Sequence, residues 1–99
     1  MHETSLPLHT RLNLETAPIS WAELERFFAR GRVLQVASQL DLVEVATALA
    51  QDDTARFKQW LESEAVRHLP DEVARQWAED DRHLWAVVVA PWVIAQDRR

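Results

Sequence analysis

The best candidates for chemistry gather near the C-terminal end of the sequence. The stretch EDDRH holds Glu79, Asp80, Asp81 and His83. A second acidic pair, Asp52 and Asp53, lies at another predicted helix junction. Carboxylates and an imidazole bind a divalent cation when they converge, and paired carboxylates do general acid–base work when burial separates their pKa values. One hypothesis is therefore a metal-dependent enzyme or small-ligand binder that uses Asp80, Asp81 and His83 with Asp52 or Asp53.

The spacing of these residues favours a simpler interpretation. Neither the His-Glu-x-x-His motif nor a calcium-binding loop occurs in the sequence. Asp pairs at helix junctions most often cap and solvate the helix ends. None of the four serines lies on the strand-to-helix elbow that an exposed nucleophile needs. We therefore predict no catalytic residue and no cofactor, and the acidic residues remain weak metal candidates.

Composition excludes several other classes of function. The sequence has no cysteine, which rules out disulfides, thiolate nucleophiles and Cys-based zinc sites. It has one glycine, Gly31, whereas loops that cradle phosphates need several glycines at close spacing. A net charge of -5 without a basic stripe makes nucleic acid a poor partner. Arg26, Arg30 and Arg32 form the one local positive cluster.

Length and the first residues set the expected organisation. The 99 residues, of which 47% are hydrophobic, fit one soluble domain. The N-terminus lacks the cationic start and apolar core of a secretory signal, so we expect a cytoplasmic protein. We predict a flexible lead over residues 1–14, a single α+β domain over residues 15–96 and a polar tail over residues 97–99.

Apolar spacing predicts about four helices packed on a small sheet of two or three strands. The helices are expected within residues 21–30, 38–53, 54–65 and 70–81. The first is the best specified, because Ser20 and Glu23 can form a capping box and Gly31 can end the helix in a left-handed conformation. Asp52 or Asp53 can cap the third helix. The β-branched run RVLQVA predicts a strand, and VRHL a second, shorter one.

The stretch LWAVVVAPWVIAQ, residues 84–96, predicts the last strand. Its thirteen uncharged residues are too few to span a membrane, which takes about 20. Pro91 would break a helix in the middle, and the many Val and Ile residues prefer extended backbone. We therefore predict one long apolar strand that bends at Pro91 or lies at a sheet edge in its second half. Both of its faces are apolar.

A strand that is apolar on both faces must be covered on both faces. If the helices leave part of it uncovered, the surplus apolar surface marks a contact site. We therefore predict a twofold homodimer, and the expected interface residues are Trp92, Val93, Ile94, Trp85 and Trp21. The alternative is that helices cover both faces and the monomer is complete.

Three blocks of the sequence together resemble a family of short bacterial proteins, domain of unknown function 2288. They are ETAPISWAELERFFARGRVLQV, LDLVEVATALAQDD and LWAVVVAPWVIAQ, and the resemblance runs from about Leu12 to Gln96. It implies a bacterial cytoplasmic protein and transfers no activity, cofactor or catalytic residue. The favoured hypothesis is thus a non-catalytic interaction module that self-associates or binds a protein partner, with no role for nucleic acid or a membrane.

Overall fold

A computed structural model describes residues 6–80 and 82–98. Its elements, in chain order, are α1 (Leu8–Glu15), β1 (Ala17–Ile19), α2 (Trp21–Ala29), β2 (Val33–Val36), α3 (Leu42–Ala50), α4 (Thr54–Glu62), β3 (Val66–His68), α5 (Asp71–Glu79), β4 (Leu84–Val89) and β5 (Trp92–Asp97). The mixed α+β class predicted from the sequence is confirmed. The counts differ, because the described residues form five helices and five strands.

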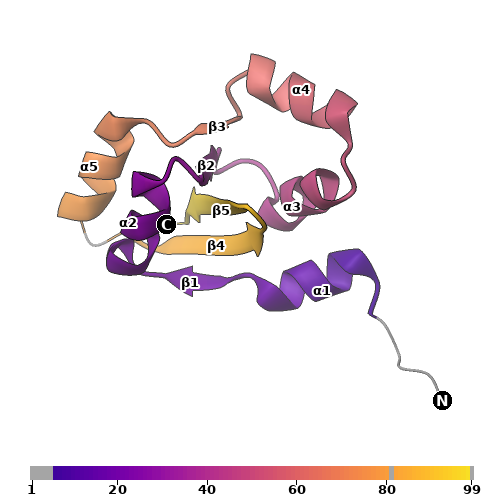
Figure 1. Cartoon of the computed structure of the whole chain (residues 1–99), viewed down its shortest axis with the longest axis horizontal. Coiled ribbons are helices and arrows are strands. Elements are labelled where there is room, and N and C mark those ends of the chain that lie inside the picture. Colours follow the sequence, from indigo (N-terminus) through magenta and orange to yellow (C-terminus); the bar gives the residue numbers. More distant parts are fainter. Residues whose placement is uncertain (1–5, 81, 99) are drawn as a thin grey trace.

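The five strands form one mixed sheet in the order β1-β4-β5-β2-β3 (Figure 1). The central pair, β5 and β2, is parallel, and the other neighbours are antiparallel. β3 follows β2 through two helices, and β1 enters from the N-terminal side to pair with β4. The sheet is wider than the sequence predicted, because β1, a three-residue edge strand, was not expected and the long C-terminal strand is divided into β4 and β5, whereas β3 is the short strand predicted at VRHL.

The long C-terminal strand predicted from the sequence is in fact a hairpin. The chain reverses at Ala90 and Pro91, so β4 and β5 pair from Val89 opposite Trp92 to Leu84 opposite Asp97. Proline has no backbone N–H to donate to a neighbouring strand. Because Pro91 lies in the turn, no hydrogen bond between strands is lost. β5 consequently lies in the centre of the sheet, between β4 and β2, and not at an edge.

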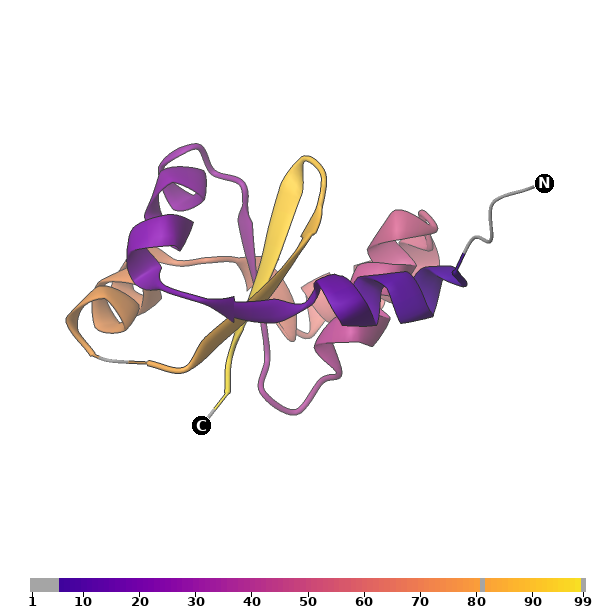
Figure 2. The ribbon, with the colours of Figure 1, turned by 90° about the horizontal axis from the view of Figure 1, so that it is seen from below.

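Helices cover both faces of the sheet. Figure 2 shows α2 and α5 on one side and α1 and α3 on the other. On the α3 side, Val87 and Ile94 pack with α1, α3 and the half-buried aromatics of α4. On the α2 side, Val93 packs with Leu24 of α2 and Trp77 of α5. These two cores account for the double-sided apolar pattern within one chain, whereas the predicted oligomeric state stays a prediction.

Part of the predicted flexible lead is helical. Residues 8–15 form α1, and its Leu12 is only 3% exposed in the core with α3, while residues 1–5 lie outside the described residues. Sequence periodicity missed this helix because it buries a single residue and has no side-chain cap. Short helices of this kind owe their stability to tertiary packing and not to helix propensity.

Local signals elsewhere predicted the elements well. Ser20 and Glu23 form the capping box at the start of α2, and Gly31 follows the helix at a φ of +70°. The Asp53 side chain caps α4 by accepting a hydrogen bond from the backbone N–H of Arg56 at 3.2 Å. Among the described helices, none is long and apolar enough to cross a membrane.

Candidate functional site

The sheet has two ends of different chemical character. Because β2 and β5 are parallel, their carboxyl ends lie together, and β4 begins beside them. We call this end, formed by residues 37–41, 82–84 and 96–98, the polar end. The opposite end carries the turn between β4 and β5, and we call residues 88–92 the hairpin tip.

The acidic group near residue 80 forms ion pairs at the polar end. Arg82 donates hydrogen bonds from Nη2 to Asp80 Oδ2 at 2.9 Å and from Nη1 to Asp97 Oδ2 at 2.6 Å. The hydrogen bond with Asp97, and then that with Asp80, raises the pKa of Arg82. His83 is exposed, and Asp81 lies outside the described residues. The guanidinium therefore occupies the position that a cation would take beside Asp80.

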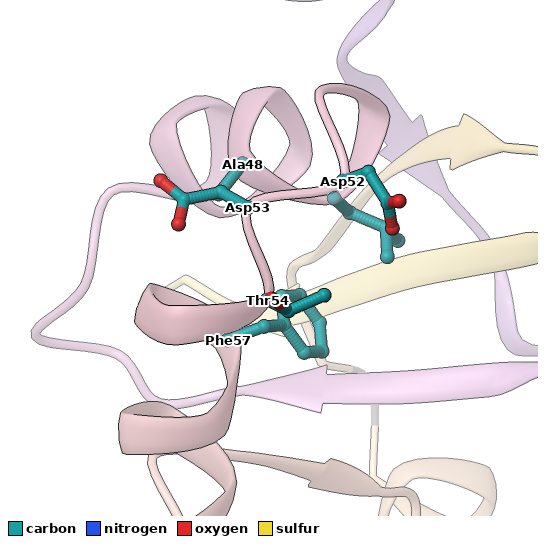
Figure 3. Close-up of a pocket in the computed structure, with 6 residues that line it drawn as sticks. Ala48, Asp52, Asp53, Thr54 and Phe57 are labelled. Atoms are coloured by element: carbon teal, nitrogen blue, oxygen red, sulfur yellow. The ribbon is translucent and has the colours of Figure 1, made fainter.

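Asp52 and Asp53 lie far from that group, in the link between α3 and α4 (Figure 1). Figure 3 shows their carboxylates pointing away from each other, on opposite sides of a small pocket. Asp52 has a φ of 59°, a left-handed conformation that Asp tolerates in turns. Across residues 6–80 and 82–98, no group of three or more His, Cys, Asp or Glu residues is placed to hold a metal ion. The structure thus does not bring the two acidic groups together.

A buried glutamine that the sequence analysis missed organises the polar end. Gln96 is 2% exposed, and its amide donates to the carbonyl oxygens of Ala37 at 2.9 Å and Leu40 at 2.8 Å. Its Oε1 accepts from Arg98 Nε at 3.0 Å, and the Arg98 guanidinium lies over the Trp85 ring at 4.8 Å. The sequence signal was a polar residue two positions after Ile94 in the same strand. Because side chains alternate along a strand, Gln96 lies on the same buried face as Ile94.

An open basin lies where the parallel strands end. It has a volume of about 690 Å³ and is lined by Asn13, Ser38, Gln39, Leu40, Asp41, Val43, Gln96, Asp97 and Arg98. The carboxyl ends of parallel strands are the usual ligand site in open α/β sheets. Here, however, Asp41 caps α3 through the backbone N–H of Val43 at 2.9 Å. Gln96 also holds the loop, so these two polar side chains of the basin serve the fold.

The hairpin tip is apolar and exposed. Val88 is 56% exposed, and Ala90 and Pro91 are also exposed. Trp92 is half-buried, with its ring edge-on to His68 at a centroid distance of 5.5 Å. Val88 pairs with Val93 and Val89 pairs with Trp92, so Val88 is exposed on the α2 side of the hairpin end and Trp92 is half-buried on the α3 side. The exposed Val88 and turn are the apolar surface that a contact with another molecule would use.

The structure divides the interface residues predicted from the sequence. Val93 is 2% exposed and Ile94 0%, because helices cover both faces of β5. Neither side chain is therefore on the surface of the single chain. Trp85 and Trp92 are half-buried on the α3 side, and Trp21 is half-buried on the α2 side. Of the predicted set, Trp92 lies at the hairpin tip, while the predicted association itself stays a prediction.

Comparison with known proteins agrees with the sequence resemblance. A family model described as "Protein of unknown function (DUF2288)" matches residues 7–97, and the chain belongs to this family. The chain is similar to PA1075 from Pseudomonas aeruginosa, known from an NMR solution structure, with 50% sequence identity and a TM-score of 0.83. The similarity covers 100% of this chain and 92% of that one. A comparison with curated proteins gave no match.

Proposed function

We propose that this protein is a non-catalytic cytoplasmic interaction module that pairs with a second copy of itself through the hairpin tip. The observation that carries the proposal is the 56% exposure of Val88 beside Pro91 on a paired hairpin. An apolar side chain that stays in water in the single chain gains free energy when a partner covers it, about 25 cal/mol per Å² of apolar surface.

The charge distribution favours the hairpin tip as the place where two copies meet. Two chains that each carry a net charge of -5 repel one another over most of their surfaces. Residues 84–96, which include the hairpin tip, carry no formal charge, so two copies approach there with the least repulsion. In a twofold dimer both copies present the same residues to each other, so the hairpin tip of each chain takes part in the contact.

The acidic residues give less support to the alternative of a metal-dependent enzyme or ligand binder. Asp80 is paired with Arg82, and Asp53 accepts a backbone hydrogen bond as a helix cap. Both carboxylates therefore have a structural task that explains their positions. The two groups also lie in separate parts of the fold, so they do not form one site.

The test is the Val88→Glu variant, with Leu14→Glu as the matched control. Leu14 is 68% exposed on α1, so it offers the same chemical change away from the hairpin tip. Light-scattering mass after size exclusion, measured over a range of concentrations, reports the oligomeric state. We expect a dimer for the natural chain and for Leu14→Glu, and a monomer for Val88→Glu, because association would bury an unpaired carboxylate.

Val88 is a sharper choice than Trp92, which packs against the core and whose loss would also destabilise the fold. Circular dichroism should show that Val88→Glu keeps its helical content. A natural chain that is monomeric up to about 1 mM would contradict the proposal, since contacts weaker than about 4 kcal/mol are too weak for a specific dimer. Equal dissociation of both variants would contradict the assignment to the hairpin tip.

A further inference from the structure

The pocket between α3 and α4 has the size and charge to receive the hairpin tip. Resting on the proposed function, we infer that each copy inserts its hairpin tip into the α3–α4 pocket of the other. In this arrangement Arg30 and Arg32, beside the tip, face Asp52 and Asp53 at the pocket rim. The α3–α4 pocket is thus the surface that the tip contacts, and the proposed function does not specify that surface.

The pocket is small and apolar inside. Its volume is about 120 Å³, and it is lined by Ala48, Leu49, Asp52, Asp53, Thr54 and Phe57 (Figure 3). Ala48 is 2% exposed, while Leu49 and Phe57 are half-buried. A dry cavity of about 150 Å³ holds a benzene molecule. The pocket therefore accepts one small apolar group, such as the side chain of Val88 or the ring of Pro91.

The rim of the pocket is acidic. Asp52 is exposed and Asp53 half-buried, both line the pocket, and Figure 3 shows their carboxylates directed away from each other. The neighbouring cation, Arg56, is directed elsewhere: its Nη2 lies 3.2 Å from Glu44 Oε1, and its guanidinium lies over the Trp60 ring at 4.8 Å. The rim therefore presents negative charge to whatever enters the pocket.

The hairpin tip has the complementary character. Its exposed residues are small and apolar, and the backbone carbonyl of Arg32 accepts a hydrogen bond from Val93 N–H at 2.8 Å. This bond places Arg32 directly beside the tip, and Arg30 precedes it at the end of α2; both are exposed. An apolar projection flanked by positive charge thus matches an apolar pocket with a negative rim.

One chain carries both halves of this contact. In a twofold dimer, the tip of each copy enters the pocket of the other, so the contact forms twice and the assembly closes. The same pairing also gives a use to two arginines, Arg30 and Arg32, of the cluster that includes Arg26. Interface charges of this kind act chiefly on orientation and association rate, and the apolar insertion supplies most of the affinity.

The first test neutralises the rim with Asp52→Asn and Asp53→Asn together. Asn tolerates the left-handed conformation at position 52 and can cap α4 at position 53, so the fold is kept. We expect the dissociation constant to rise about tenfold at low salt, since several weak ion pairs are lost. The salt dependence of association should also flatten, because fewer opposite charges remain to be screened.

The matched control is Glu25→Gln with Glu62→Gln, which removes the same charge from exposed positions on α2 and α4. This variant should dimerise at least as well as the natural chain, because its overall negative charge is lower. If the rim variant behaves like this control, the pocket is not the contact surface. If the natural chain is a monomer, the proposed function fails as well.

The second test observes the contact directly. A dimer that mixes isotope-labelled and unlabelled chains should show nuclear Overhauser effects between the Phe57 ring of one copy and the Val88 methyl groups of the other. Intermolecular effects between two hairpin tips, without Phe57, would overturn the pocket inference and leave the proposed function in place. Growth beyond a dimer with concentration would overturn the closed twofold arrangement.

Discussion

The two ends of the sheet differ in what their side chains already contact. At the polar end, Gln96 is 2% exposed, and it bonds the carbonyls of Ala37 and Leu40 and the guanidinium of Arg98. At the hairpin tip, Val88 is 56% exposed beside the exposed Pro91. The polar residue is thus buried and satisfied, whereas the apolar residue remains in water.

This contrast separates stability from function. A buried amide that bonds several partners holds a loop in one conformation, and its removal costs the hydrogen bonds that it donates. An exposed valine contributes little to the folded chain and gains free energy only when another surface covers it. We therefore expect changes at the polar end to affect unfolding, and changes at the hairpin tip to affect association.

The largest expected effect on stability is that of Gln96→Leu. The variant keeps the apolar stem but removes the side-chain donor of the Leu40 carbonyl and one of the two donors of the Ala37 carbonyl, which keeps the backbone N–H of Leu40 at 3.0 Å. We expect the free energy of unfolding, measured with urea, to fall by about 3 kcal/mol. Gln39→Leu is the control, because Gln39 is exposed in the same loop. A Gln96→Leu variant as stable as this control would contradict the claim that the polar end stabilises the fold.

A smaller loss is expected for Arg82→Gln, with Arg75→Gln on α5 as the exposed control. Arg82 joins Asp80 to Asp97, and its side chain is 16% exposed. The urea midpoint should fall, though by less than for Gln96→Leu. Because the pKa of Arg82 is raised in the folded chain, its contribution to folding stability is fully present below the ordinary arginine pKa. That contribution is lost only as the pH rises through the raised pKa. The difference in urea midpoint between Arg82→Gln and the natural chain should thus be constant from about pH 6 to pH 9.

A midpoint for Arg82→Gln equal to that of Arg75→Gln would show that the ion pairs at the polar end contribute nothing measurable. Such a result is common for exposed pairs. Gln96 and its carbonyl partners would then be the main source of stability at the polar end. The contrast with the hairpin tip would remain.

The sequence predicted best what neighbouring residues decide. The capping box of Ser20 and Glu23, the left-handed Gly31 and the cap of α4 all depend on residues within a few positions of one another. The first two were predicted as they stand, and of the two candidates for the third, Asp52 and Asp53, the structure shows Asp53, because the hydrogen bonds concerned are local. The family was also identified from the order of three sequence blocks.

The sequence failed where distant residues decide. The hairpin was predicted as one strand because the apolar alternation continues through Pro91, and only the pairing of β5 with β2 shows that the second half is central. Gln96 was missed as a functional element because its partners, Ala37 and Leu40, lie more than fifty positions away. Val93 and Ile94 were assigned to an interface because the sequence does not show which helices cover β5.

The most direct test of the account is a dilution series of the natural chain, followed by amide chemical shifts in nuclear magnetic resonance spectra. If the hairpin tip is the contact surface, the amides of Val88, Val89, Ala90 and Trp92 should shift with concentration. The amides of residues 37–41 and 96–98 at the polar end should stay in place. Shifts confined to the polar end, or no shifts over the full range, would contradict the account.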